Sequence, residues 1–283
     1  MKSISKESSV FNELLSKKKL VPDDVIVGRK TFVSNPEKIE IDITYECNLK
    51  CKSCNRSCGN APSSEQMSLI DIENFIEDSI KNNKKYKMIS VLGGEPTLHI
   101  NFADIILLLQ KEYADNFNPD VIIQIVSNGF TEKSQVLCND VENRNKNVRI
   151  DRLSYKINNI NDYFTPFNDA PIDDINYEKA DFSKACWVAE SCGFGLNKNG
   201  YYACAICGGI DRVLQKNNGF KSIMDLTVEE QKKHFRQFCA LCGNYKYYSS
   251  NNGNLLLRCE KAPLKNKVTK SWKNIYANYK EEV

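Results

Sequence analysis

The sequence has little histidine and no long hydrophobic run. Among 283 residues there are two histidines, and the longest run of aliphatic side chains, Ile105 to Leu109, is five residues long. A helix that spans a membrane needs about 20 predominantly apolar residues, so no membrane association is expected. The first residues, from Met1 to Glu7, are polar and contain no apolar segment typical of secretion signals. These absences predict a cytoplasmic protein.

Charge of neither sign dominates the composition. The 39 lysines and arginines are nearly balanced by 36 aspartates and glutamates, which gives a net charge of +3. Domains that bind nucleic acid usually carry a clear excess of basic residues, so a nucleic-acid partner is not expected. Hydrophobic residues make up 41% of the chain and charged residues 27%, which is typical of a globular protein with a hydrophobic core.

Cysteine, in contrast, is abundant, with 12 residues in the chain. Secreted proteins use this many cysteines for disulfides, chiefly in domains too small to build a sufficient core. In a reducing cytosol, clustered cysteines more often bind a metal ion or an iron–sulfur cluster. Only Cys138 lies far from any other cysteine in the sequence, and we expect it to be a small buried apolar residue. The grouped cysteines predict metal centres.

Hydrophobic periodicity predicts alternating strands and helices in the first half of the chain. Strands are predicted over residues 39–43, 88–92, 121–126 and 148–153, and helices over 68–82, 102–109, 131–140, 227–239 and 270–279. Ser68 and Asp71 resemble a capping box, and Asn101 is a candidate N-cap. His234 is expected at an exposed helical position. The alternation is typical of an α/β fold with a parallel sheet and helices on its outer face.

Residues suited to chemistry follow three of the predicted strands. They are the cysteines Cys47, Cys51 and Cys54, the segment Gly93, Gly94 and Glu95, and the pair Ser127 and Asn128. In parallel α/β folds, binding sites are built at the edge formed by the carboxyl ends of the strands. Two glycines let a backbone approach a ligand closely, and a glutamate can pair with an ammonium group. We therefore expect these three segments to form one site.

The first three cysteines have the spacing C-x3-C-x2-C. Three thiolates within eight residues of one loop can bind three irons of a cubane cluster and leave the fourth iron open for another ligand. Zinc bound by Cys47, Cys51, Cys54 and Cys58 is the alternative, although four ligands at such close intervals are unusual for a structural zinc site. Without a metal role, Cys58 is expected to be a free or buried thiol.

The C-x3-C-x2-C motif and the Gly-Gly-Glu-Pro segment at residues 93–96 together resemble the radical S-adenosylmethionine (SAM) superfamily. The resemblance implies that Cys47, Cys51 and Cys54 ligate a [4Fe–4S] cluster whose open iron binds SAM. Reduction of the cluster would cleave SAM to a 5′-deoxyadenosyl radical, which abstracts a hydrogen atom from the substrate. A flavodoxin- or ferredoxin-type reductant is also implied.

The same resemblance implies roles for the segments after the second and third strands. Glu95 would bind the amino group of SAM, with Gly93 and Gly94 beside it. Ser127 and Asn128 would contact the ribose or the carboxylate of SAM. The alternative for these two residues is an Asn-Gly turn that needs no ligand.

A second group of cysteines occupies the C-terminal part of the chain. Its members are Cys186, Cys192, Cys204, Cys207, Cys239, Cys242 and Cys259. Two C-x2-C-G segments within the group are typical of a four-cysteine zinc site. The group also resembles the auxiliary-cluster domain of SPASM- and twitch-type radical enzymes, which implies a second [4Fe–4S] cluster, and we favour this interpretation. The implied ligands are Cys186, Cys204, Cys239 and Cys242, with Cys192 or Cys207 as alternates.

These interpretations divide the chain into four segments. They are an N-terminal extension (1–37), a partial (β/α) radical SAM barrel (38–185), a twitch-like auxiliary cluster domain (186–262) and a C-terminal helix and tail (263–283). The short barrel resembles 2-deoxy-scyllo-inosamine dehydrogenase-like twitch enzymes. This implies oxidation of a small polar substrate, such as a sugar or cyclitol alcohol, with the auxiliary cluster as electron acceptor. The alternatives are radical modification of a ribosomal peptide or protein, and a non-catalytic zinc or iron–sulfur protein.

Candidate substrate residues follow the fourth predicted strand. Arg152 and Tyr155 are the candidate catalytic residues, and Lys156 lies beside them in the sequence. The alternative is that all three are polar surface residues. His99, four residues after Glu95, is expected to have a structural role.

Overall fold

The computed structural model describes residues 33–51, 53–156, 166–246, 248–249, 255–256 and 268–280. Most of the expected N-terminal extension and Cys259 lie outside these described residues. In the described part of the chain, no helix has the length and apolar character needed to cross a membrane.

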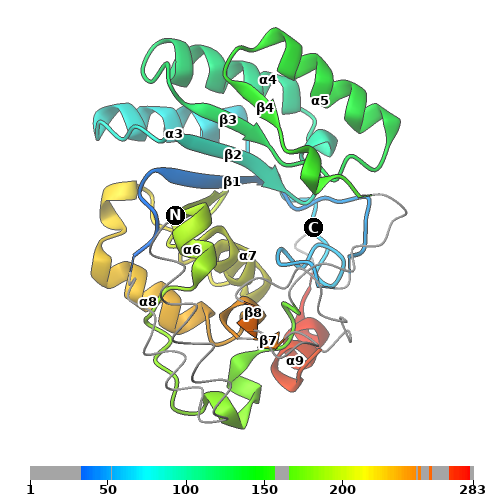
Figure 1. Ribbon diagram of the computed structural model, residues 1–283, viewed down its shortest axis with the longest axis vertical. Helices are drawn as coiled ribbons and strands as arrows, with labels where there is room; N and C mark the ends of the chain where they lie inside the picture. The colour runs from blue at the N-terminus through cyan, green and yellow to red at the C-terminus, as the bar shows by residue number, and fades with distance from the viewer. Residues whose placement is uncertain are drawn as a thin grey trace.

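A six-stranded sheet forms the centre of the molecule (Figure 1). Its strands are β1 (Lys38–Thr44), β2 (Met88–Gly93), β3 (Ile122–Ile125), β4 (Val148–Ile150), β5 (Phe194–Asn197) and β6 (Gly200–Tyr202). The spatial order is β4-β3-β2-β1-β5-β6, and every neighbouring pair is parallel except β5 and β6. The α/β fold with a predominantly parallel sheet is therefore confirmed.

Helices cover both faces of this sheet. The helices are α3 (Leu69–Lys81), α4 (Phe102–Leu108), α5 (Glu132–Arg144), α6 (Trp187–Cys192), α7 (Ala205–Leu214), α8 (Val228–Phe238) and α9 (Lys270–Asn278). In Figure 1, α3, α4 and α5 lie on one side of the sheet and α6 to α9 on the other. Each side has its own hydrophobic core, and the second core contains the C-terminal cysteines.

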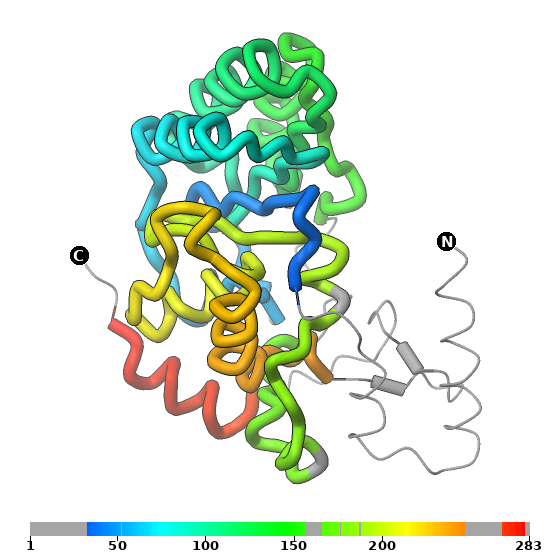
Figure 2. The backbone as a smooth tube through the Cα atoms, turned by 90° about the vertical axis from the view of Figure 1, so that its left-hand side faces the viewer, coloured from blue at the N-terminus to red at the C-terminus, as the bar shows by residue number. Residues whose placement is uncertain are grey.

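Shorter elements complete the described chain. A π-helical segment, η2 (Leu109–Asp115), continues α4, and β7 (Tyr248–Ser249) pairs with β8 (Leu255–Leu256). The 3-10 turns are η1 (Pro96–Leu98), η3 (Arg152–Ser154), η4 (Pro171–Asp173), η5 (Ile175–Tyr177), η6 (Ile223–Asp225) and η7 (Gly243–Tyr245). The last helix, α9, lies along α7 (Figure 2).

Local signals predicted the starts of α3 and α8, whereas α6 and α7 were not predicted from the sequence. Ser68 and Asp71 form the expected capping box, because each side chain accepts a hydrogen bond from the other residue's backbone N–H. Thr227 caps α8 on one side only, because its hydroxyl accepts from the Glu230 N–H without a return bond. Asn101 occupies the N-cap position of α4 as predicted, but its side chain makes no capping hydrogen bond.

The central strand β1 is buried on both faces. Its alternating residues Ile39, Ile41 and Ile43 are fully buried in the core beneath α3 and α4. Glu40 and Asp42 point to the opposite face, where they meet Arg56 from the loop that follows β1. The strand therefore carries the apolar core on one side and acidic residues on the other.

The sheet continues past residue 185, where we expected the barrel to end. β5 adds to the free edge of β1 through parallel pairing of Ile39, Glu40 and Ile41 with residues 194–196. A Cβ on Gly195 would lie 2.3 Å from the Cα of Ala205, so only glycine lets α7 pack this closely on β5. The cysteine-rich segment is thus joined to the barrel strands by one continuous sheet.

The expectation that His234 is exposed is wrong. Its side chain is buried and packs against the rings of Tyr202, Phe220 and Phe238. The spacing explains the burial, because residues 231, 234, 235 and 238 form one face of α8 and all four are buried.

Candidate functional site

The first cysteine group lies on the loop that follows β1. Cys47, Cys51 and Cys54 are all partly exposed. Burial raises the pKa of Cys47 to about 11, and the charges of Cys54, Glu95 and Cys51 add to this effect. A hydrogen bond from the Cys58 thiol lowers the pKa of Cys54 to about 6. Cys58 is therefore a buried thiol in contact with one of the three motif cysteines.

Two glycines bring the end of β2 against this loop. The N–H of Gly94 donates to the carbonyl of Thr44 over 2.8 Å, and a Cβ on Gly93 would lie 2.1 Å from that same oxygen. A Cβ on Gly94 would lie 2.1 Å from the carbonyl oxygen of Glu46. The glycines are thus needed for backbone packing at the site, and their contact with a cofactor stays a prediction.

Glu95 is fully buried at the centre of the site. Its Oε1 accepts hydrogen bonds from the Thr97 N–H (3.1 Å) and the Ser127 hydroxyl (2.8 Å), and its Oε2 accepts from the Asn128 N–H (2.7 Å). The segments after β2 and β3 therefore meet, as the sequence predicted. The hydrogen bonds from Thr97, Ser127 and Asn128 hold the Glu95 carboxylate in a fixed orientation near Cys47.

Asn128 joins this centre to the cysteine loop. Its side-chain amide donates to Asn48 over 2.8 Å and lies 3.9 Å from the sulfur of Cys47. Its carbonyl accepts a 2.6 Å hydrogen bond from the Lys156 N–H. The three strand ends are thereby connected through one chain of hydrogen bonds.

Lys156 is a cation whose charge acts on this group. It is half-buried, and burial lowers the pKa of its ammonium group, while the charges of Cys51, Cys54 and Cys47 act against that lowering. The ammonium group therefore lies within electrostatic reach of all three motif cysteines. Its place after β4, at the carboxyl edge of the sheet, was the available sequence signal.

Arg152 and Tyr155 have different surroundings. Arg152 is half-exposed and forms a 2.6 Å ion pair with Glu142 on α5. The Tyr155 ring packs on Gly129, and its hydroxyl is buried without a hydrogen-bond partner in the described residues. The catalytic role of both residues stays a prediction.

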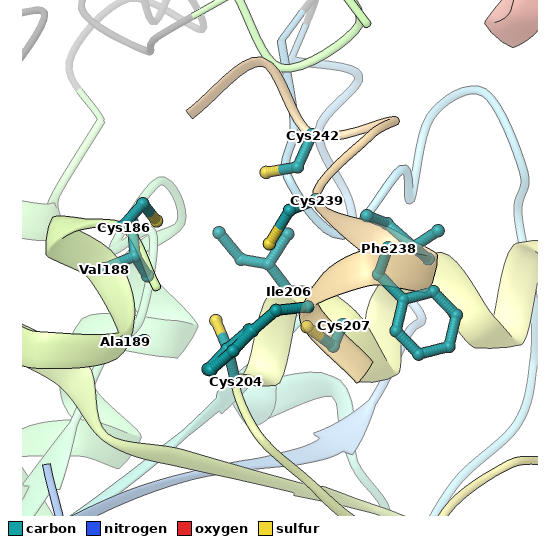
Figure 3. Close-up of a pocket in the computed structure, with 11 residues that line it drawn as sticks. Cys186, Val188, Ala189, Cys204, Ile206, Cys207, Phe238, Cys239 and Cys242 are labelled. Atoms are coloured by element: carbon teal, nitrogen blue, oxygen red, sulfur yellow. The ribbon is translucent and has the colours of Figure 1, made fainter. Parts of the chain in front are cut away.

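The second cysteine group is buried between α6, α7 and α8. Cys186 precedes α6, Cys204 precedes α7, Cys239 follows α8, and Cys242 precedes the turn η7. Together with Cys207 they line one pocket, whose walls include Val188, Ile206 and Phe238. In Figure 3 the sulfur atoms of Cys186, Cys204, Cys239 and Cys242 point toward a common space.

The two alternates lie in different places. Cys207 is on the first turn of α7, where its thiol hydrogen-bonds with Cys204 and Cys239. Cys192 does not line the pocket and contacts the carboxylate of Glu40 instead. Across the described ranges, no group of three or more His, Cys, Asp or Glu side chains is arranged to hold a metal ion.

The last helix, α9, forms hydrogen bonds with the segments that carry both cysteine groups. Tyr276 on α9 hydrogen-bonds with Ser57 in the first cysteine loop over 2.8 Å. Trp272, one turn earlier, donates over 2.7 Å to the carbonyl of Leu241, between Cys239 and Cys242. The two cysteine segments therefore share a common support.

Residues 41–180 match the family model described as the Radical SAM superfamily. This segment contains the first cysteine group, Glu95, Asn128 and Lys156. The match covers 140 of the 283 residues and identifies a radical SAM domain at residues 41–180. No curated protein matches the chain.

Two solved structures are similar to parts of the chain. One is SuiB from Streptococcus suis, bound to its precursor peptide SuiA, with 20% identity over 41% of this chain and a TM-score of 0.31. The match spans 24% of that protein's length. The other is BtrN in complex with AdoMet and 2-DOIA, with 15% identity, a TM-score of 0.42, and coverage of 74% of this chain and 92% of that one.

Proposed function

We propose that this chain is a radical SAM enzyme that carries two [4Fe–4S] clusters and oxidises a small polar substrate. The observation that supports the proposal is the contrast between the two cysteine groups. The first offers three partly exposed cysteines on one loop, and the second offers buried cysteines around a pocket whose other walls are apolar. The first suits a cluster with one iron left for SAM, and the second suits a cluster ligated by the protein alone.

Cys47, Cys51 and Cys54 would hold the first cluster. When bound there, a reduced cluster with SAM would supply a radical able to abstract a hydrogen atom from the substrate. Glu95 is buried, and its hydrogen bonds fix its orientation, so it would bind the amino group of SAM. Lys156 would bind the carboxylate, because its ammonium group lies within electrostatic reach of the same cysteines.

Cys186, Cys204, Cys239 and Cys242 would hold the second cluster. Their thiols are buried, which excludes water and suits a fully ligated cluster. Cys204 precedes a helix of ten residues, α7, whose free N–H groups and dipole stabilise negative charge at that end. Cys207 would support the cluster by hydrogen bonding to its ligands Cys204 and Cys239.

Polar side chains around the first group favour a substrate with hydroxyl or amino groups. Asn128 lies 3.9 Å from the Cys47 sulfur and hydrogen-bonds with Asn48, and the two amides supply both donors and acceptors. These amide groups can hydrogen-bond to a polar metabolite. An apolar substrate would displace the water bound to them without replacing its hydrogen bonds.

The test is anaerobic reconstitution with iron and sulfide, followed by SAM, dithionite and a panel of sugar and cyclitol alcohols. We expect 5′-deoxyadenosine to form, and one substrate class to yield an equimolar ketone. Cys51→Ala should abolish 5′-deoxyadenosine, whereas Cys138→Ala, a buried cysteine on α5 outside both groups, should retain it. A protein fully loaded with iron that forms no 5′-deoxyadenosine would refute the proposal, and oxidation of peptides alone would favour peptide modification.

A further inference from the structure

A buried ion network lies on the acidic face of β1. The guanidinium of Arg56 donates to Glu40 over 2.7 Å and pairs with Asp42 over 3.1 Å. The side chains of Arg56, Glu40 and Asp42 are only 5%, 14% and 1% exposed. Taking three charges out of water carries a large desolvation cost, which stability alone rarely explains.

This network lies between the two cysteine groups. Arg56 is two residues after Cys54, and a Cβ on Gly209 of α7, the helix that starts after Cys204, would lie 3.9 Å from its Cδ. Glu40 pairs with Gly195 on β5, where a Cβ would lie 2.7 Å from the carbonyl carbon of Cys204. Arg56 therefore lies against both the first cysteine loop and α7, and Glu40 lies closer to the second group.

The cysteine loop is also fixed directly to α7. Arg212 on α7 donates to the carbonyls of Arg56 over 2.9 Å and Ala61 over 3.0 Å. A Cβ on Gly209 would lie in contact with the carbonyl oxygen of Asn55, 3.4 Å away. Because α7 starts at Cys204, these contacts hold the first loop in a set position relative to the second group.

Each [4Fe–4S] cluster gains a negative charge on reduction, so a fixed cation nearby raises its reduction potential and a fixed anion lowers it. On the basis of the function proposed above, we propose that Arg56 is a positioning residue shared by both clusters. Through its ion pairs with Glu40 and Asp42 it stays between the cysteine groups and raises the reduction potential of each cluster. One buried cation thereby couples the potentials of two clusters.

The test is a redox titration followed by electron paramagnetic resonance, with full-length protein reconstituted with iron and sulfide. Arg56→Gln should lower the midpoint potentials of both clusters, because two carboxylates lose their cation. Arg56→Lys should keep both potentials closer to wild type. Glu40→Gln should raise the potential of the second cluster and move the first less. Glu37→Gln is the matched control, since Glu37 lies just before β1 and is half-exposed, and it should move neither.

The outcomes separate this inference from the proposed function. Unchanged potentials in Arg56→Gln, or a shift of only one cluster, would overturn the inference even if 5′-deoxyadenosine forms normally. Zinc in the second group would overturn it as well. If Arg56→Gln does not fold, Glu40→Gln decides, and an unmoved second potential would refute the coupling. Shifted potentials without any 5′-deoxyadenosine would instead count against the proposed function alone.

Discussion

Individual residues at the first cysteine group act either by hydrogen bonding to Glu95 or by charge on the cysteines. Ser127 and Thr97 use their hydrogen bonds to orient Glu95, so they act through that carboxylate. Lys156 differs, because its ammonium group interacts with the cysteines by charge. It is the residue whose substitution tests SAM binding most selectively.

We predict that Lys156→Met raises the KM for SAM about 10-fold to 100-fold, because a hydrogen bond to a charged group contributes about 1.5–3 kcal/mol. Lys156→Arg should recover part of the loss. Steady-state formation of 5′-deoxyadenosine measures the effect. Arg152→Met is the comparison, since its ion pair with Glu142 is exposed and should not affect SAM. Equal effects of both substitutions would argue against carboxylate binding by Lys156.

At the scale of elements, the junction between β2 and the cysteine loop depends on two glycines. We predict that Gly94→Ala separates β2 from the cysteine loop, because the new Cβ would lie 2.1 Å from the carbonyl oxygen of Glu46. Iron bound by the first group should then be lost while the second cluster remains. Iron content and the electron paramagnetic resonance spectrum report this outcome.

Gly209→Ala is the matched control for that substitution. Its new Cβ would meet Asn55 at 3.4 Å, an ordinary contact, within helix α7. Alanine also favours a helix interior over glycine by about 1 kcal/mol. Full iron content is expected, and equal loss in both variants would indicate general destabilisation instead of a local clash.

The buried face of α8 makes stability depend on pH through His234. Burial lowers the pKa of His234, whereas histidine in the unfolded chain titrates near about 6.5. As the pH falls through that value, the unfolded chain binds a proton that the folded chain does not. The free energy of unfolding therefore falls toward acid pH and is fully retained above the unfolded pKa.

We predict that His234→Phe reduces this acid-side loss of stability. Phenylalanine can pack among Tyr202, Phe220 and Phe238. It loses the hydrogen bonds that His234 makes with the Ala203 N–H and with the backbone of Asn218. Thermal unfolding at about pH 7.5 and about pH 5.5 brackets the pKa of about 6.5 of histidine in the unfolded chain. It gives the slope of stability against pH for both proteins. Parallel slopes would mean that other groups control the acid response.

For the whole molecule, sequence predicted what depends on local pattern. Ile39, Ile41 and Ile43 alternate on one face of β1, and Ser68 caps α3, because both signals lie within a few residues. The convergence of Glu95 and Asn128 also followed, since both come after strands of one parallel sheet. The match of residues 41–180 to the radical SAM superfamily agrees with these motifs.

Elements made by distant contacts were not predictable in this way. β5 has four residues and includes Gly195, which is needed for contact with Ala205 and weakens any strand pattern. α7 contains adjacent glycines at 208 and 209, which lower its helix propensity. Its first turn also falls within a C-x2-C-G segment, which is typical of a zinc site. The ion network of Arg56 with Glu40 and Asp42 joins residues 14 and 16 positions apart, and no periodicity marks it.

The function proposed for this chain requires two iron–sulfur clusters of different ligation. The most direct measurement is the iron, acid-labile sulfide and zinc content per chain after anaerobic reconstitution, compared between wild type and Cys242→Ala. We predict about eight irons and eight sulfides in the wild type, because each cluster contributes four of each. About four irons should remain in Cys242→Ala. A wild type with about four irons and one zinc would contradict the account.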